Sequence, residues 1–280
     1  MKKFLTLTLM LIFCQTICAA QSINLSELEN KYNAVIGVYV IDTNTDRTFE
    51  YNADLRFAYC STHKVFTVAE LLRQKSLNEL RQIKHYGEKD ILSYAPVTKN
   101  HVADGMTWAD ICQAALRLSD NTAANLILDE IGGIKAFRKS LRRIGDKITF
   151  PARNEPELNF FAPNDIRDTS TPRQTALNLQ KYILGNVLCE EKKNLLIDWM
   201  SNNSITDTLI KAAVPKDYSV IDKSGTGANY STRNDIAVIF PPNRKPIVIA
   251  IMTRGKSVDA QVKGSLVADV AEIVRRNFDE

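Results

Sequence analysis

Apolar residues follow two patterns along this chain, a strand-like pattern near both ends and a helical pattern in between. The segment 34–42 is rich in Val, Ile and Tyr, a polar turn follows at 44–46, and 47–51 is again strand-like. Two such runs joined by a short polar turn predict a β-hairpin. Strand character returns late in the chain, in the segments 219–224, 232–240 and 247–252.

Between about residues 61 and 200 the apolar positions recur with the period of an α-helix. The helices predicted from this pattern span residues 65–75, 107–118, 121–130, 134–144 and 175–184. Thr107 and Asp110 have the spacing of a capping box, which marks a helix start. A short helix is expected at 25–33, and an amphipathic helix at 259–277 closes the chain. The stretch from Thr149 to Thr171 has no regular period, and so long a loop in a compact domain usually has a function.

Strands at both ends and helices in the middle predict an α/β (α+β) fold with two lobes. An antiparallel sheet lobe, built from about 21–56 and 205–280, is flanked by the N- and C-terminal helices. An all-helical lobe, about 57–204, is inserted into it. A site in such a protein is expected in the cleft between the lobes.

The first twenty residues read as a secretory signal peptide. Lys2 and Lys3 precede a mostly apolar run from Phe4 to Cys18, and Ala19-Ala20 stands before a polar residue. A membrane anchor is the alternative, but the run is shorter than the roughly 20 residues that span a bilayer. We therefore expect residues 21–280 to be the mature, exported protein, in the periplasm or secreted, without a stable membrane anchor.

Charge and metal-ligating residues restrict the possible partners. The formal charge is +4, and the leader carries two lysines and no acid, so the mature chain is at +2. Without a basic stripe, we expect no nucleic-acid partner. The mature cysteines are odd in number, their spacing matches no zinc pattern, and the histidines are scattered. These residues are Cys60, Cys112, Cys189, His63, His85 and His101. No metal and no cofactor are expected.

One Ser-x-x-Lys motif, Ser61 to Lys64, opens a helical run. Residues three apart lie on one face of a helix, so Lys64 is expected beside Ser61. A serine is a weak nucleophile until a neighbouring base activates it, and a lysine pushed towards neutrality can act as that base. The alternative is an N-cap serine followed by an exposed lysine.

Two further motifs have structural alternatives of their own. Ser119-Asp120-Asn121 stands between two predicted helices, where all three residue types are also good N-caps. Lys223-Ser224-Gly225 ends a strand and is followed by Thr226, where a turn lysine beside a hydroxyl is equally reasonable.

Taken together and in this order, the three motifs are the signature of class A β-lactamases and penicillin-binding proteins. The chain has Ser224 where threonine is usual, which keeps the hydroxyl. It resembles class A serine β-lactamases over essentially the whole mature length. The resemblance implies hydrolysis of the β-lactam ring of penicillins and cephalosporins through an acyl-enzyme on Ser61. The partner would be a small β-lactam, and the protein a monomer.

The irregular stretch also resembles this family, in its omega loop. Glu155 and Asn159 match the residues that position the water attacking the acyl-enzyme. By the same resemblance Arg153 pairs with Asp168 across the neck of the loop, and the Glu155–Pro156 peptide bond is cis. The alternative is an acidic, solvated loop.

The resemblance assigns further roles. Backbone N–H groups of Ser61 and Thr226 would form the oxyanion hole, and Ser119 would protonate the departing lactam nitrogen. Lys64 or Glu155 would take the serine proton, a choice that the sequence leaves open. The substrate-binding residues implied are Tyr94, Asn121, Lys223, Ser224, Thr226 and Arg233. Arg233 could instead form an interstrand ion pair, and Tyr94 could be a partly buried loop residue.

Two rival functions share the first three motifs. A penicillin-binding D,D-peptidase acylates similarly but releases β-lactams slowly, and a β-lactam sensor binds covalently without turnover. The omega-loop residues favour the hydrolase. In related enzymes Cys112 and Cys60 have disulfide partners at the positions of Val68 and Gly227, so all three mature cysteines are expected to be free.

Overall fold

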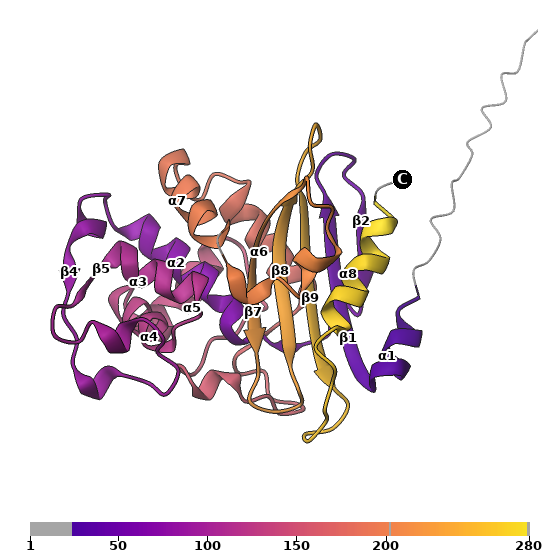
Figure 1. The fold of residues 1–280 in the computed structure, drawn as a ribbon, viewed down its shortest axis with the longest axis horizontal. Helices are drawn as coiled ribbons and strands as arrows, with labels where there is room; N and C mark the ends of the chain where they lie inside the picture. Colours follow the sequence, from indigo (N-terminus) through magenta and orange to yellow (C-terminus); the bar gives the residue numbers. More distant parts are fainter. Residues whose placement is uncertain (1–23, 202, 279–280) are drawn as a thin grey trace, which may run out of the picture.

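A five-stranded antiparallel sheet runs through the molecule, in the strand order β2-β1-β9-β8-β7 (Figure 1). The computed structural model describes residues 24–201 and 203–278. The strands are β1 (Ala34–Asp42), β2 (Thr48–Tyr51), β7 (Ser219–Thr226), β8 (Arg233–Phe240) and β9 (Ile247–Gly255). The first two strands form the predicted hairpin, and β9 pairs with β1, so the two ends of the chain meet in the middle of the sheet.

The two terminal helices, α1 (Ser26–Tyr32) and α8 (Leu266–Arg276), cover one face of the sheet (Figure 1). Alternation along β1 explains the layers, because successive side chains of a strand point to opposite faces. Ile36, Val38 and Val40 pack in the core under the terminal helices. Tyr39 and Ile41 belong to the second core, under the helical part of the chain.

The other face of the sheet is covered by α6 (Pro172–Ile183), beyond which the remaining helices lie (Figure 1). These are α2 (His63–Gln74), α3 (Trp108–Arg117), α4 (Asn121–Glu130), α5 (Gly133–Arg143) and α7 (Glu190–Ser201). Every residue of α2 from His63 to Leu72 is buried, as expected for a helix at the centre of its lobe. The predicted fold class, an antiparallel sheet with terminal helices and an inserted helical lobe, is confirmed.

One predicted helix start was confirmed and another lies three residues earlier than predicted. The hydroxyl of Thr107 accepts a hydrogen bond from the N–H of Asp110 at 3.1 Å, so Thr107 is the N-cap at the predicted start of α3. The helix predicted at 175–184 begins earlier, at Pro172. Proline suits a first helical position because its missing N–H would have no partner there.

The predicted helix at 259–277 is wrong over its first seven positions, because α8 begins only at Leu266. The preceding residues make tertiary contacts instead. Ala260 lies directly against Gly255 at the end of β9, and the N–H of Val262 donates to the hydroxyl of Ser231 at 3.1 Å. Helix α7 was not predicted individually, because its first half is a run of charged residues.

Two short strand pairs were also missed. They are β3 (Phe57–Ala58) with β6 (Thr169–Ser170), and β4 (Ile83–Lys84) with β5 (Met106–Thr107). Two-residue strands leave no periodicity to detect. The first pair joins the segment before the nucleophile motif to the end of the irregular loop.

That irregular loop is closed at its neck as predicted. Arg153 Nε lies 2.5 Å from Asp168 Oδ2, and the hydroxyl of Tyr59 donates to the same carboxylate at 2.9 Å. The Glu155–Pro156 peptide bond is cis, also as predicted. The neck therefore ties the loop to the segment that carries the nucleophile motif.

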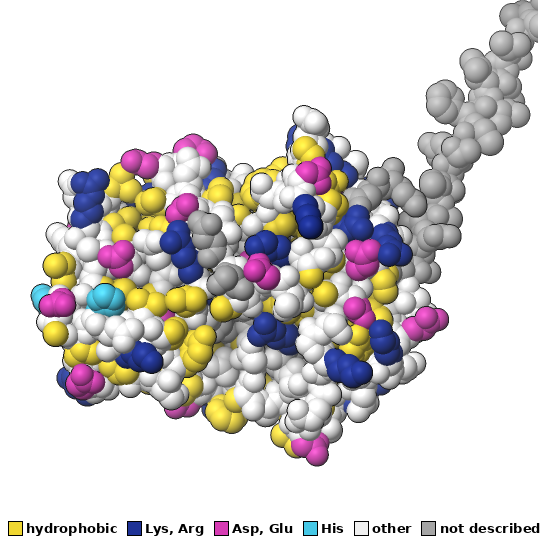
Figure 2. Space-filling view, viewed as in Figure 1, with side chains coloured by type: hydrophobic (Ala, Val, Ile, Leu, Met, Phe, Trp, Pro, Cys, Tyr) yellow, Lys and Arg dark blue, Asp and Glu magenta, His cyan; other side chains and the backbone are white. Residues whose placement is uncertain are grey.

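The predicted signal peptide, residues 1–20, lies outside the described residues. Among the helices that the structure does describe, none is long and apolar enough to cross a membrane. Acidic and basic side chains are interspersed over the face seen in Figure 2.

Candidate active site

A cavity of about 490 Å³ opens between the helical lobe and the β7 edge of the sheet. Its lining includes most of the residues singled out in the sequence: Ser61, Tyr94, Ser119, Asn121, Asn159, Ser224, Thr226 and Arg233. Lys64, Glu155 and Lys223 are buried beside it. Ile205, which the sequence did not indicate, lines it as well. The structure thus brings all the predicted site residues into one place.

Ser61 lies in a short 3₁₀ turn, Cys60–Thr62, that leads directly into α2. The turn starts at Cys60 with a φ of 49°, a value that residues other than glycine adopt rarely and that is often found at functional sites. Asn234 of β8 secures the approach to this turn, because its side chain donates to the carbonyl of Ala58 at 2.8 Å. Sequence reasoning missed Asn234, since only strand pairing brings it here.

Steric contact with the nucleophile turn explains why the Lys-Ser-Gly motif has a glycine at position 225. A Cβ atom at Gly225 would lie 2.9 Å from the carbonyl oxygen of Tyr59 and 3.2 Å from the backbone nitrogen of Ser61. Such distances are too short for a side chain, so only glycine allows β7 to pass this close to the nucleophile turn.

Lys64 connects its own motif to the Ser-Asp-Asn motif and to the irregular loop. Its ammonium donates to the carbonyl oxygen of Ser119 at 2.7 Å and to Asn121 Oδ1 at 2.6 Å, and lies 3.1 Å from Glu155 Oε1. Burial lowers the pKa of Lys64, and the negative charge of Glu155 offsets part of that effect. The lysine is therefore the shared centre of the site, not an exposed residue after an N-cap.

Glu155 faces both the nucleophile and the loop. Its Oε1 accepts a hydrogen bond from Ser61 Oγ at 3.3 Å, and its Oε2 accepts one from Asn159 Nδ2 at 2.5 Å. Burial acts to raise the pKa of this carboxyl, but the charge of Lys64 and the hydrogen bonds from Lys64 and Asn159 act together in the other direction, so the pKa is lowered and the group is ionised. The alternative of a solvated acidic loop is excluded at this position, because Glu155 is buried.

Asn125 holds the backbone of Glu155 from α4. Its Oδ1 accepts from the N–H of Glu155 at 3.0 Å, and its Nδ2 donates to the carbonyl oxygen of Glu155 at 2.9 Å. Asn125 was not predicted as a site residue from the sequence. The available signal was its position four residues after Asn121, on the same face of the helix.

Ser119 stands between two lysines. Its hydroxyl accepts from Lys223 Nζ at 3.1 Å and from Lys64 Nζ at 3.3 Å. Burial, together with the positive charge of Lys64, lowers the pKa of Lys223 to about 7. The residue itself has a φ of 57°, and the buried carboxylate of Asp120 fixes the loop by accepting the N–H groups of Val97 and Ala123.

Two residues at the cavity mouth complete the site. Arg233 begins β8 and donates from Nη1 to the hydroxyl of Thr226, its partner across the strand pair. This contact is a hydrogen bond between strands, whereas the alternative considered for Arg233 was an ion pair. Tyr94 is about half exposed, and its carbonyl accepts the N–H of Asn121 at 3.0 Å.

The three cysteines of the described chain, Cys60, Cys112 and Cys189, are free, which confirms that prediction. No group of three or more potential metal ligands occurs within residues 24–201 and 203–278. His63 is buried, and its ring nitrogen Nδ1 lies 2.8 Å from the carbonyl oxygen of Cys60, under the nucleophile turn. Burial lowers the pKa of His63 to about 4.

A serine at the start of a buried helix, hydrogen-bonded to an ionised carboxylate that is paired with a buried lysine, is the arrangement of an active-serine hydrolase. The comparisons with known proteins specify the family. The model of the "Beta-lactamase enzyme family" matches residues 20–278. The chain belongs to this family, and its relatives of known structure place it in class A.

The similarity extends over nearly the whole chain. It is 48% identical to Beta-lactamase 3 of Bacillus cereus over 249 residues, covering 89% of this chain and 78% of the relative. It is likewise 48% identical to beta-lactamase ROB-1 of Haemophilus influenzae over 250 residues, covering 89% and 82%. A crystal structure of a class A β-lactamase from Clostridium kluyveri DSM 555 superposes with a TM-score of 0.90 at 50% identity, covering 91% of this chain and 97% of that one.

Proposed function

We propose that this protein hydrolyses the β-lactam ring of penicillins and cephalosporins through an acyl-enzyme on Ser61, and so gives resistance to these antibiotics. The observation that carries the proposal is the contact of Ser61 Oγ with Glu155, a carboxylate held in place by Lys64 and Asn159. Because the chain belongs to the β-lactamase family, we expect the carbonyl carbon of the β-lactam ring to be the atom that Ser61 attacks.

In the first step Ser61 attacks the lactam carbonyl carbon. Backbone N–H groups of Ser61 and Thr226 stabilise the oxyanion, because strand β7 runs directly along the nucleophile turn. Either Lys64 or Glu155 takes the hydroxyl proton. The hydrogen bond from Ser61 Oγ to Glu155 favours the carboxylate in this arrangement, since the ammonium of Lys64 donates to Ser119 and Asn121.

Cleavage of the C–N bond needs a proton on the departing nitrogen. Ser119 supplies it, and its own proton is replaced from one of the two lysines that contact its hydroxyl, Lys64 and Lys223. This role explains why a serine stands between two buried ammonium groups.

Substrate binding uses the polar side chains along the cavity wall. Lys223, Ser224, Thr226 and Arg233 hold the substrate carboxylate, for which the guanidinium offers parallel donors. Asn121 binds the amide of the acyl side chain, and Tyr94 forms the wall on the opposite side of the mouth.

In the second step water hydrolyses the ester. Glu155 removes the proton from this water and Asn159 orients it, because the two side chains are hydrogen-bonded to each other beside Ser61. No cofactor takes part in this scheme.

The test combines turnover with covalent labelling. A chromogenic cephalosporin should be hydrolysed continuously by the wild type, whereas a D,D-peptidase or a sensor would stop after one equivalent. Ser61→Ala should abolish turnover and the mass increase of one penicillin, while Ser257→Ala, at an exposed serine on the sheet side, should keep both. A full-mass adduct on the Ser61→Ala variant would contradict the assignment.

We also infer that residues 21–280 form one catalytic domain that acts as a monomer after export to the periplasm or the medium. Family membership supports the small β-lactam as its partner. The lobes, about 21–56 with 205–280 and about 57–204, share the cavity, so neither is expected to act alone. Mass spectrometry of the secreted protein would give the cleavage site, expected after Ala20.

A further inference from the structure

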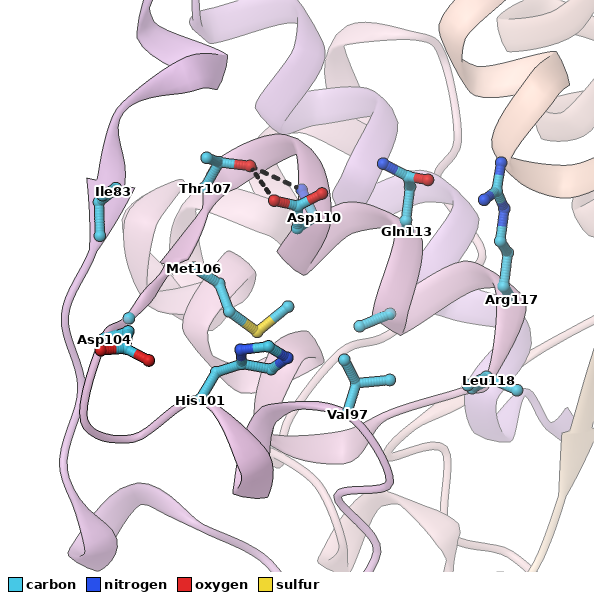
Figure 3. A pocket seen from close by; sticks show the side chains of 12 residues that line it. Ile83, Val97, His101, Asp104, Met106, Thr107, Asp110, Gln113, Arg117 and Leu118 are labelled. Carbon is cyan, nitrogen blue, oxygen red and sulfur yellow. Dashed lines mark hydrogen bonds between the residues drawn. The ribbon is translucent and has the colours of Figure 1, made fainter.

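A second hollow, of about 510 Å³, lies in the helical lobe between α3 and the loops around β4 and β5 (Figure 3). None of its lining residues lines the catalytic cavity. Its volume is within the range of 300–1,000 Å³ that is common for small-molecule sites in proteins. The proposed hydrolysis does not use it.

Two apolar side chains and one imidazole line the middle of this hollow. Figure 3 shows the side chains of Met106, His101 and Val97 directed towards its centre. At its edge, Ile83 is 58% exposed and Leu118 is 36% exposed, although both are large apolar residues. Covering such side chains with an apolar ligand is favourable, since each buried CH₂ group is worth roughly 0.8 kcal/mol.

The charges at the edge are mainly negative. Asp104 and Asp110 lie on the side towards β4 and β5, and both are exposed. Arg117 is the one arginine or lysine in the lining, and its guanidinium is paired with Asp198 at 3.0 Å. The hollow therefore favours a cation.

The catalytic cavity has the opposite preference. Lys64, Lys223 and the carboxylate of Glu155 are buried beside it, and Arg233 lines it, so basic groups outnumber the acid. Anionic ligands are attracted there and organic cations are repelled, so one ligand class can be directed to the second hollow alone.

The wall of the second hollow is joined to the catalytic loop by the backbone. The carbonyl of Ala114 accepts the N–H of Asp120 at 3.1 Å, and the N–H of Val97 donates to the Asp120 carboxylate at 3.0 Å. Leu118 directly precedes Ser119. An occupant that displaces these wall residues therefore acts on the loop that holds Ser119 and Asn121.

We propose that this hollow binds a small organic cation with a flat apolar body, of the arylalkylammonium class, and that its occupancy modulates turnover through the loop from Leu118 to Asn121. The ring lies on Met106 and between Ile83 and Leu118, and the ammonium faces the two carboxylates. This site lies outside the catalytic cavity and does not depend on which β-lactams the enzyme hydrolyses.

Binding is tested by isothermal titration with tryptamine, without any β-lactam. Asp104→Asn should weaken binding roughly two- to fivefold, since exposed charge pairs contribute modestly. Ile83→Thr should weaken it about fourfold through lost apolar contact. The controls, Asp217→Asn and Ile148→Thr, make the same changes at other exposed residues away from the hollow and should bind as the wild type does. Failure of the wild type to bind at about 10 mM, or equal affinity in all five proteins, would overturn the proposal.

Coupling is tested by penicillin hydrolysis with tryptamine present. The expected result is a change in kcat at saturating penicillin, which in Ile83→Thr needs about fourfold more tryptamine. The activity of Ile83→Thr without tryptamine stays that of the wild type. An effect on KM alone would mean competition in the catalytic cavity, and an unchanged kcat with tryptamine bound would refute the coupling. Absence of hydrolysis altogether would instead refute the proposed function, and the titration would still decide the binding site.

Discussion

The Nζ atom of Lys64 lies 3.1 Å from Oε1 of Glu155, and both side chains are fully buried. A buried ion pair of this kind is costly to break, because removing one partner leaves the other charge in the interior without compensation. The pair joins the helix that carries the nucleophile to the loop that carries the deacylating base. Changes on either side should therefore affect individual steps of the reaction in different ways.

Replacement of the deacylating base should separate the two steps. Glu155→Ala should still react with penicillin through Ser61, but the ester should persist, because general-base assistance is typically worth roughly 10²–10⁴-fold. The expected observation is a stoichiometric burst followed by a nearly silent steady state. Intact-protein mass spectrometry should find the chain heavier by one penicillin.

The control for this variant is Glu157→Ala, which removes an exposed carboxylate from the same loop. It should turn over at close to the wild-type rate. If Glu155→Ala did the same, another group would be the deacylating base. If Glu155→Ala failed to acylate, the carboxylate would also serve the first step, as its hydrogen bond with Ser61 suggests.

The activity should decline at alkaline pH because of Lys223. Burial, with the charge of Lys64, lowers the pKa of Lys223 to about 7, so its ammonium is progressively lost above neutral pH. Since a neutral lysine attracts the substrate carboxylate less, kcat/KM for penicillin should fall between pH 7 and 9, mainly through KM.

Lys223→Arg should flatten this decline, because a guanidinium stays protonated throughout the range. Lys216→Arg, at an exposed lysine just before β7, should keep the wild-type profile. A wild-type kcat/KM that is constant from pH 6 to 9 would show that Lys223 remains an ammonium group.

Two buried acids near Lys223 should make the protein less stable as pH rises. Asp222 in β7 and Asp235 in β8 each have a carboxylate oxygen with no hydrogen-bond partner among the described residues. Burial raises the pKa of Asp222 to about 6, from 3.8 for an unperturbed Asp. The folded state thus holds this proton more tightly than the unfolded chain does. The stabilisation is complete below about pH 4 and is lost as pH rises through 6.

An amide in place of the carboxyl group of Asp222 should prevent this loss of stability at higher pH, because it does not ionise. Asp222→Asn should increase the free energy of unfolding at pH 8, by on the order of 3 kcal/mol at most, and leave it unchanged near pH 4. Asp217→Asn, at an exposed acid, should show no such pH-dependent gain. Urea unfolding at both pH values measures the difference, and an equal effect of Asp222→Asn at pH 4 and 8 would rule out titration as the cause.

The close approach of β7 to the nucleophile turn can be tested with one methyl group. Gly225→Ala places a Cβ 2.9 Å from the carbonyl oxygen of Tyr59, so the strand must move away from Ser61. A displacement of this size can cost up to about 10²-fold in kcat. Gly264→Ala, where an added Cβ has no neighbour within 4 Å, should retain both activity and thermal stability. Normal kcat in Gly225→Ala would mean that the strand position is not critical.

Thiol titration should distinguish native from denatured protein. Cys60 and Cys112 are buried and Cys189 is exposed, and all three are free. The mature chain should therefore react at one thiol when folded and at three in denaturant without reductant. A single thiol in denaturant would reveal a disulfide between two of them.

The sequence alone was sufficient for the order of the five strands of the main sheet and of every α-helix but α7, because strand composition, helix periods and caps are local properties. Thr107 with Asp110 marked the start of α3, and the Val, Ile and Tyr residues of segment 34–42 predicted β1. The local pattern gave a wrong prediction at residues 259–265. It is compatible with a helix there, but the segment makes tertiary contacts instead. The three motifs and the omega-loop residues identified the site because their chemistry is specific as an ordered set.

Only the tertiary structure decided how these residues act on one another. Asn125 and Asn234 support Glu155 and the nucleophile turn from α4 and β8, and no spacing along the chain relates Asn234 to that turn. The shifted pKa of Lys223 likewise depends on burial and on Lys64 in another element. Charges and hydrogen bonds act through space over a few ångströms, so packing of the lobes determines which groups contact each other. The sequence determines only which groups are present.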